Sequence, residues 1–258
     1  MNADVIISVP KLKVHKKVGV TLNVKNLVGI TTNKNFLVHY SVTPPREGGD
    51  QYPDDLFTPV EEALIKTERW MYDHFLANGK WFWEYLHRTI YAIHNNTTRR
   101  LGLKVTESKR KLDAGNWYGN DSAWRMAVDL MKICTFTDHN GSLKETPQRK
   151  TLSIIDGIIG GEKNGPLLPD PKLSGVLLCG ENYLAVDIVA TRLMGFDPLK
   201  LKMYSYLLKS GIYGFCSPSD IEVLSNNTRW QKCLLDSQDP FLSYKPHTGW
   251  IGHIEINK

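Results

Sequence analysis

The chain has 258 residues, 41% of them hydrophobic and 23% charged, and a formal net charge of +5. This composition excludes a disordered chain, a collagen-like chain and a coiled coil. No apolar run approaches the ~18 residues that a membrane-spanning helix needs, and the N-terminal apolar run precedes the charges, the reverse of a secretory signal. We therefore expect a cytoplasmic protein with no membrane partner.

The N-terminal part predicts a buried strand followed by a basic segment. Residues 4–9 are apolar and β-branched and stop at Pro10, which is typical of a strand that ends in a loop. From Val18 to Val24, apolar and polar residues alternate, which indicates a second strand. A short helix over 21–28 is the alternative interpretation of the same residues.

Residues 59–96 have the most helical pattern of the chain. Pro59 fits the first position of a helix, and acidic residues follow it in the first turn, where they are favourable. A second helix is expected over 81–95. We expect the two helices to form a hairpin within an insertion over 59–120, packed by the aromatic side chains Trp70, Phe75, Trp81 and Trp83.

The second half of the chain alternates strand and helix patterns. Strands are predicted at 151–156, 175–179, 220–225 and 250–256, and helices from an Asp121 or Ser122 cap to about Cys134, at 182–194 and at 198–209. The order of strand, crossover helix and strand indicates an α/β fold. We expect a single α/β domain over 1–258, with a mixed, mostly parallel sheet covered by helices.

Basic side chains and two histidines follow the first predicted strand. No acidic residue occurs between Asp4 and Glu47, whereas this interval holds Lys11, Lys13, His15, Lys25 and His39. A stretch whose charges are all positive attracts anions, and lysine offers a point charge for a phosphate or carboxylate. Histidine can move protons or bind a metal ion. The alternative is a solvated basic loop.

Two later segments carry acidic side chains in unusual places. Asp156 ends an apolar strand and precedes glycines, so its carboxylate could lie beside exposed backbone N–H groups that bind an anion. A tight structural turn over 157–166 is the alternative. Asp187 lies among apolar residues of a helix and needs a partner there, either in a functional site or as a cap on a neighbouring loop.

The four cysteines do not form a recognisable cluster. They are Cys134, Cys179, Cys216 and Cys233, and no two of them make a C-x-x-C pair. An iron–sulfur site needs closely spaced thiolates, and a disulfide framework needs a denser set. We therefore expect reduced thiols and no iron–sulfur cluster in this chain.

Several of these blocks together resemble the family called domain of unknown function 362. The matching blocks are P-K-x-K-x-H at 10–15, G-x-T-x-x-x-K-N-x-x-G at 19–29, then His39, D-G-I-x-x-x-E-x-x-G-P at 156–166 and A-V-D at 185–187. Members of this family usually carry an N-terminal α/β segment before the first block, and many carry ferredoxin-like cysteine clusters. The resemblance therefore implies a chain that is shortened at its N-terminus, with a weakened case for electron transfer.

A shorter stretch is similar to nickel-pincer lactate racemases, which implies chemistry on a small hydroxy acid. The leading interpretation is an enzyme that acts on a small anion, either a hydroxy acid or a phosphorylated compound. The residues predicted to bind the anion are Lys11, Lys13, Thr21, Lys25, Asn26, Gly157 and Gly165. The residues predicted to be catalytic are His15, His39, Asp156 and Asp187, and Glu162 is the predicted ligand of a divalent metal.

The alternative is a non-catalytic accessory protein that binds an anionic cofactor or a redox partner protein through the same basic face. Nucleic acid is not favoured, because a second basic run over 99–111 lacks interleaved aromatic residues. For a single site, the segments 11–29 and 156–166 must meet at one end of the sheet. As part of a strand, Lys25 would point into a cleft or into solvent.

Overall fold

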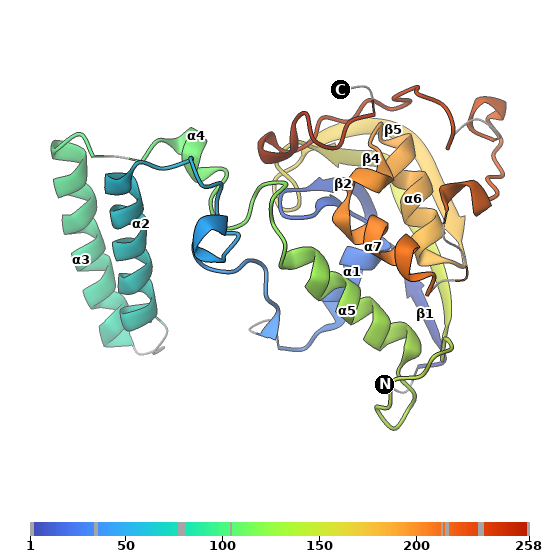
Figure 1. The fold of residues 1–258 in the computed structure, drawn as a ribbon, viewed down its shortest axis with the longest axis horizontal. Coiled ribbons are helices and arrows are strands. Elements are labelled where there is room, and N and C mark those ends of the chain that lie inside the picture. The colour runs from blue at the N-terminus through green and yellow to red at the C-terminus, as the bar shows by residue number, and fades with distance from the viewer. Residues whose placement is uncertain are drawn as a thin grey trace. The chain divides into compact units, whose positions relative to one another are not determined.

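The computed structural model describes residues 3–33, 36–76, 81–103, 105–212, 214, 217–231 and 235–256 (Figure 1). The chain divides into two compact units. Residues 1–52 and 114–258 make the first, which we call the α/β unit, and residues 53–113 make the second, which we call the helical unit.

A five-stranded sheet forms the frame of the α/β unit. Its strands are β1 (Val5–Ser8), β2 (Lys11–His15), β3 (Gly19–Thr21), β4 (Lys150–Glu162) and β5 (Asp170–Gly180). β1 and β2 run parallel to β4, β5 runs antiparallel to β4, and β3 runs antiparallel to β2. The predicted α/β fold with a mixed sheet is therefore confirmed.

β1 and β2 lie along the same edge of β4. Ser8 lies opposite Ser153 and Lys11 lies opposite Asp156, at the same sequence offset, so the two strands form one run with a short break. Pro10 lies in that break, because it has no N–H to donate to a ladder. The loop predicted after Pro10 is wrong, since pairing with β4 resumes at Lys11 as β2. Its carbonyl still accepts a hydrogen bond from the backbone N–H of Asp156 at 2.9 Å.

The helices of the α/β unit are α1 (Asn23–Asn26), α5 (Ala123–Phe136), α6 (Tyr183–Leu193) and α7 (Lys202–Ser210). All four contribute buried side chains to one core, which also contains Leu12, Val14, Ile155 and Val176 from the sheet. Short 3-10 turns occur at Leu27–Ile30, Pro45–Glu47, Pro198–Lys200, Pro218–Asp220, Thr228–Trp230 and Thr248–Trp250. None of the described helices has both the length and the hydropathy needed to cross a bilayer.

The strand predicted through Val24 is wrong, and the short-helix alternative is confirmed. β3 ends at Thr21, and α1 begins at Asn23. The first N–H groups of a helix have no partner within the helix. Here the Asp187 carboxylate accepts the backbone N–H groups of Asn23 and Val24 at 2.8 and 3.0 Å. That partner lies 164 residues along the chain from Asn23, so the local pattern could not show it.

The predicted end of a strand at Asp156 is wrong, and so is the alternative of a tight turn directly after it. β4 continues through the glycines to Glu162, with an irregularity between Gly157 and Ile159. The absence of a side chain at Gly157 makes this possible, because a Cβ there would lie 2.7 Å from the Val176 side chain and 2.8 Å from that of Leu12. Asp156 is thus an interior residue of a long strand.

In the second half, the helices are confirmed and two strands are not. α6 and α7 match the predicted helices, although a 3-10 turn replaces the start of the second one. α5 is also confirmed, but its cap is not the predicted Asp121 or Ser122 side chain. The N–H of Ala123 donates to the Asn120 side chain, and the N–H of Ser122 donates to the Asp50 carboxylate. Residues 221–225 pair with no strand, and residues 251–256 form turns with one bridge between Glu255 and Phe196.

The helical unit contains the two helices predicted from the sequence. They are α2 (Pro59–Met71), which continues as a π-helical turn over Tyr72–Leu76, and α3 (Trp81–Arg100), and α4 (Glu107–Arg110) follows. Thr58 and Glu61 form a capping box at the start of α2. Ion pairs of 2.6 and 2.9 Å join Lys109 to Glu61 and Arg110 to Glu68.

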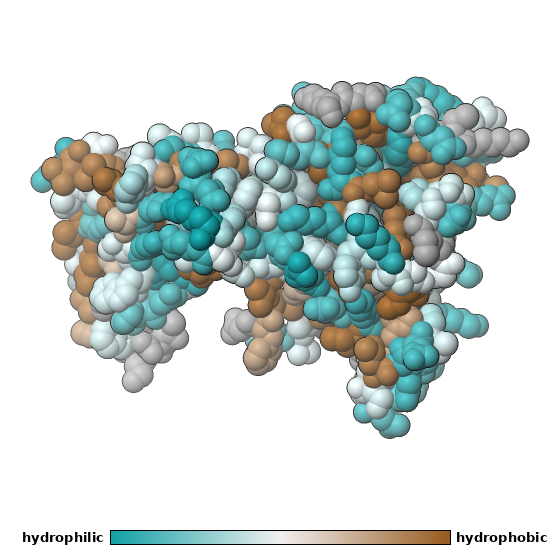
Figure 2. Space-filling model, viewed as in Figure 1, coloured by the Kyte–Doolittle hydropathy of each residue, from teal (hydrophilic) through white to brown (hydrophobic). Residues whose placement is uncertain are grey.

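The aromatic core predicted for this hairpin is wrong where the structure describes it. Trp70 is 53% exposed, and Trp83 is only partly buried. The side chains of Phe75 and Trp81 lie outside the described residues. Hydrophobic side chains instead gather on the surface of α3 (Figure 2), where Ile93 is 61% exposed. On a pair of helices, aromatic residues can lie on the outer surface as readily as between the helices. The sequence pattern alone does not distinguish these two arrangements.

Candidate functional site

β2 presents a row of basic side chains on the sheet face opposite the core. Successive side chains of a strand point to opposite faces, and Leu12 and Val14 are fully buried in the core. Lys11, Lys13 and His15 therefore point to the other face, which we call the outer face. Thr21 of β3 is paired with Lys13 and shares that face.

At the start of β2, Lys11 forms an ion pair with Asp156. The Lys11 Nζ lies 2.5 Å from an Asp156 carboxylate oxygen, and more than a third of each side chain is exposed. The hydrogen bond from Lys11, together with one from the backbone N–H of Ile158, holds the pKa of Asp156 below its usual value. Asp156 is therefore an ionised surface carboxylate and a poor proton acceptor at neutral pH.

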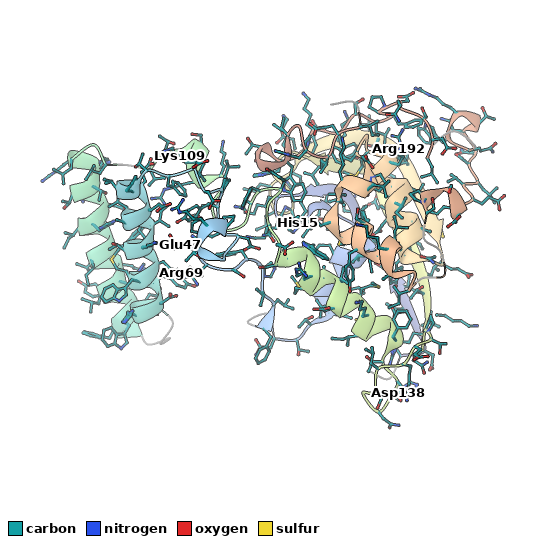
Figure 3. The ribbon with its side chains drawn as sticks, in the orientation of Figure 1. His15, Glu47, Arg69, Lys109, Asp138 and Arg192 are labelled. Atoms are coloured by element: carbon teal, nitrogen blue, oxygen red, sulfur yellow. The ribbon has the colours of Figure 1, made fainter. Side chains whose placement is uncertain are left out.

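At the other end of β2, His15 is held in its neutral form. Only 6% of the residue is exposed (its position is labelled in Figure 3), and its Nδ1 accepts the backbone N–H of Lys17 at 3.0 Å. Burial lowers the pKa of His15 well below its ordinary value, and the charges of Lys25 and Lys17 lower it further. Because Nδ1 accepts a hydrogen bond, the proton of the neutral ring lies on Nε2.

His39 adopts the opposite tautomer. Its Nδ1 lies 2.8 Å from the carbonyl oxygen of Leu37, which can only accept, so Nδ1 carries the proton and Nε2 has the lone pair. Burial lowers the pKa of this half-buried histidine, the Leu37 hydrogen bond raises it, and the charges of Lys25 and Lys17 lower it. His39 is therefore also neutral at physiological pH.

The two histidines and three lysines interact electrostatically, and we call His15, His39, Lys16, Lys17 and Lys25 the histidine cluster. Lys25 is only 5% exposed, on α1. The expectation that it lies on a strand is therefore wrong, and so is its exposure to solvent, whereas its position in a cleft stays a prediction. Among the described residues, the charged side chains that shift the pKa of either histidine are all positive. An anion bound there would be stabilised, and it would raise both histidine pKa values.

Two polar atoms near this cluster are buried without a hydrogen-bond partner among the described residues. They are the Thr21 hydroxyl oxygen and the Asn23 side-chain oxygen. Buried polar atoms are rarely left unpaired, so a bound ligand or water is the ordinary explanation. Lys13, opposite Thr21, donates to the Pro166 carbonyl at 3.1 Å, and burial and the charge of Lys11 lower its pKa.

Asp187 is fully buried and acts on the site through the backbone. Besides the two backbone N–H groups at the start of α1, its carboxylate accepts the Asn23 side-chain amide at 2.8 Å and the Tyr204 hydroxyl at 3.2 Å. Burial raises its pKa to about 7, although these hydrogen bonds lower it. The arrangement fits the cap that the sequence left open as an alternative, and it makes Asp187 a positioning residue for α1. A catalytic role of Asp187 stays a prediction.

The predicted binding residues Asn26, Gly157 and Gly165 have structural partners. The Asn26 side-chain amide donates to the Ser8 hydroxyl at 3.1 Å. The Gly165 carbonyl accepts the backbone N–H of Lys16 at 3.1 Å, and a Cβ at Gly165 would lie 2.9 Å from the carbonyl carbon of Val14. Gly165, like Gly157, allows a close approach between segments. Whether these residues also contact a ligand stays a prediction.

Glu162 lies in separate surroundings at the end of β4. Its carboxylate accepts the backbone N–H of Lys245 at 3.1 Å and lies 4.0 Å from the Lys172 Nζ. Within the described ranges, no three His, Cys, Asp or Glu side chains are grouped as a metal ion requires. The divalent metal therefore stays a prediction for which we identify no set of ligands.

The two sequence blocks meet, since β2 pairs with β4 and the Gly165 carbonyl accepts the N–H of Lys16, but the residues predicted to be catalytic do not gather at one point. β2 pairs with β4, and Lys11 lies opposite Asp156 while Lys13 lies opposite Gly161. At ~3.3 Å a residue, however, His15 lies about 13 Å along the strand from Lys11. The Lys11–Asp156 pair and the histidine cluster are therefore two distinct places on the outer face.

Sequence reasoning did not single out Lys17, Asn23 and Tyr204. Lys17 belongs to the acid-free basic stretch, and this signal could have identified it. Its amine donates to the Ala114 carbonyl and lies 4.8 Å from the Tyr40 ring centre. No local signal marks Asn23 or Tyr204, because both act through Asp187, which is distant in sequence from Asn23.

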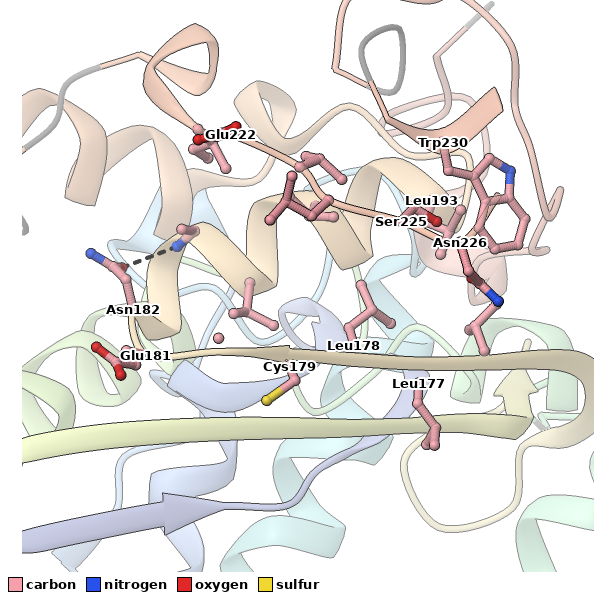
Figure 4. A pocket seen from close by; sticks show the side chains of 18 of the residues that line it. Leu177, Leu178, Cys179, Glu181, Asn182, Leu193, Glu222, Ser225, Asn226 and Trp230 are labelled. Atoms are coloured by element: carbon pink, nitrogen blue, oxygen red, sulfur yellow. Dashed lines mark hydrogen bonds between the residues drawn. The ribbon is translucent and has the colours of Figure 1, made fainter. Parts of the chain in front are cut away.

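A cavity of about 980 Å³ lies elsewhere in the α/β unit, between β5, α6 and residues 221–230 (Figure 4). Its lining is mostly apolar and includes Leu178, Val189, Leu193 and Trp230. None of the residues predicted to be catalytic, ligand-binding or metal-binding is among its described lining residues. The cavity is therefore separate from the histidine cluster.

Comparisons with known proteins give a family and one short match. The chain is 43% identical over 47 residues to the Thylakoid-associated protein sll1697 of Synechocystis sp., a stretch that covers 18% of this chain and 15% of that protein. No solved structure matches the chain. The model of a family described as "Domain of unknown function (DUF362)" matches residues 1–192.

Proposed function

The chain belongs to the DUF362 family, whose description assigns no activity, and we propose from its site that it is an enzyme that moves a proton on a small bound anion. The substrate class is a hydroxy acid or a phosphorylated compound. The observation that carries this proposal is the pair of neutral histidines with opposite tautomers among positive charges. One ring offers a donor and the other offers a base.

The charges of the cluster select the substrate. Lys25 and Lys17 act on both histidines, so an anion near the rings meets two cations. The buried Thr21 hydroxyl would supply a hydrogen bond beside Lys13. These groups suit a compact carboxylate or phosphate with a neighbouring hydroxyl or carbonyl oxygen.

The histidines divide the reaction between them. The His39 Nε2 accepts a proton from the substrate and becomes a cation, which the bound anion stabilises. The His15 Nε2–H donates a hydrogen bond to the substrate oxygen on which negative charge develops, and it stays neutral throughout. His39 then returns a proton to the substrate atom that lost it, either the same proton or one that has exchanged with water, which restores the starting state.

Anion binding is tested by thermal shift with inorganic phosphate and with lactate as probes. Either probe should raise the melting temperature of the wild type and of the control Lys150→Met, whose charge lies at the exposed start of β4. Lys17→Met and Lys25→Met should lose most of that shift. Equal shifts in all four proteins, or none in the wild type, would contradict anion binding at the cluster.

Proton transfer is tested by exchange in heavy water. A panel of small hydroxy acids and their phosphate esters is incubated with the wild type and with His39→Gln, and proton NMR follows the loss of carbon-bound hydrogen. Enzyme-dependent exchange with at least one compound, lost in His39→Gln, is the expected result. Anion binding without exchange across the panel would instead favour the non-catalytic accessory protein.

The relative's name associates that protein with thylakoids. For this chain, a cytoplasmic location and a redox partner protein remain predictions. Neither the charge pattern nor the histidine cluster requires a particular compartment.

A further inference from the structure

The outer face of the sheet exposes apolar side chains away from the histidine cluster. Val5, Ile7 and Val9 alternate along β1 and its extension, Ile159 lies on β4, and Leu173 and Leu177 lie on β5. Each is more than half exposed, and Leu173 reaches 80%. We call these six residues the apolar sheet face.

The strand registers place these residues on one surface. Ile159 is paired with Leu173, and Leu177 is paired with Asp156, which points to the outer face together with its partner Lys11. In Figure 4, Leu177 and Cys179 extend from β5 on the side away from α6, whereas Leu178 extends toward α6. The helices that bury the core thus leave this face open in the part of the chain that the structure describes.

The size of this face indicates what could cover it. The exposed parts of the six side chains hold on the order of 600 Å² of apolar area, which is a large patch for a monomer. A standard protein–protein interface buries ~800 Å² on each partner. The apolar sheet face, together with the polar side chains that lie among its residues, is therefore large enough for a dimer.

The charged pair within this face favours a second copy of the same chain. Lys11 and Asp156 carry opposite charges and lie between Leu177, Val9 and Ile159 on the outer face. In a twofold dimer, each residue of this pair can face its opposite in the other copy, so the charged pair is complementary to itself. We infer that the apolar sheet face is a dimer interface at which the sheets of two copies pack together, as in a β-sandwich.

The test is the mass in solution of the full chain, measured by light scattering after gel filtration at micromolar concentration. The wild type should have twice the chain mass of 29.3 kDa. Leu177→Asp and Leu173→Asp should each halve that mass, because a charge would be buried against an apolar surface. The matched control is Leu224→Asp, since Leu224 is 85% exposed outside the sheet, and it should remain dimeric.

A second readout shows that the variants still fold and that this face is the one involved. Cys179 is exposed on the outer face of a single chain, so a dimer should slow its alkylation, as followed by peptide mass spectrometry. Alkylation should become faster in Leu177→Asp while the circular dichroism spectrum and melting transition are retained. A monomeric wild type, including one that instead binds lipid vesicles, would overturn the inference, as would a dimer that Leu177→Asp leaves intact with Cys179 still protected.

Discussion

The two ends of β2 carry the same kinds of residues in different surroundings. At one end, Lys11 meets Asp156 in the open, and their charges balance. At the other end, His15 is buried among lysines, and no negative charge in the described part of the chain contributes to the shift of its pKa. The buried positive charges around His15 favour the binding of an anion. At the other end of β2, Asp156 already neutralises the charge of Lys11.

The largest expected effect comes from removing the carboxylate that organises the histidine end. Asp187→Ala leaves the buried donors of Asn23, Val24 and Tyr204 without their acceptor. We expect a loss of about 4 kcal/mol in the free energy of unfolding, since each unsatisfied buried donor costs ~1–3 kcal/mol. Urea denaturation at neutral pH measures it. An unchanged midpoint would show that α1 does not depend on Asp187.

A smaller effect concerns pH and His15. Its folded pKa lies below the unfolded value of ~6.5, so its contribution to stability is present above that pH and is lost as the pH falls. From about pH 7.5 to about pH 5, we expect the stability difference between wild type and His15→Gln to shift by about 2 kcal/mol, against the wild type. Denaturant titrations across this range measure the difference.

Because Asp187 also titrates in this range, the effect of His15 is measured as the difference in stability between the wild type and His15→Gln. The pKa of Asp187 is raised to about 7, so its contribution has the opposite sense, is greatest at low pH and is lost as the pH rises through the folded value. In the wild type, the pH dependence from His15 and that from Asp187 oppose each other. Asp187 is present in both proteins, so the difference in stability between wild type and His15→Gln keeps its sign. Parallel stability curves for the two proteins would mean that His15 titrates normally.

The smallest effect is expected at the other end of β2. In the monomeric background of Leu177→Asp, Asp156→Asn removes one charge of an exposed ion pair, and such pairs contribute little to stability. We expect a midpoint within the error of the denaturation experiment and an unchanged response to phosphate. A clear loss of phosphate binding would join the two ends of β2 into one site.

The sequence predicted the parts of this region that depend on local pattern. The break at Pro10 follows from the missing N–H of proline, and the basic stretch predicted the charge of the cluster. The strand β2, with Leu12 and Val14 buried, was not predicted, because the local pattern indicates a loop after Pro10 and the partner strand β4 is distant in sequence. The helix at Lys25 did not follow from the pattern, because its cap comes from a distant residue. The tautomers of His15 and His39 depend on backbone groups that only the folded chain brings into position.

The most direct test of the central claim is the tautomeric state of the two histidines, measured by long-range proton–nitrogen NMR correlation at about pH 7.5. We predict that His15 is neutral with its proton on Nε2 and that His39 is neutral with its proton on Nδ1. Addition of inorganic phosphate should raise the pKa of both rings. Two histidines with the same tautomer, or either ring protonated at that pH without phosphate, would contradict the account.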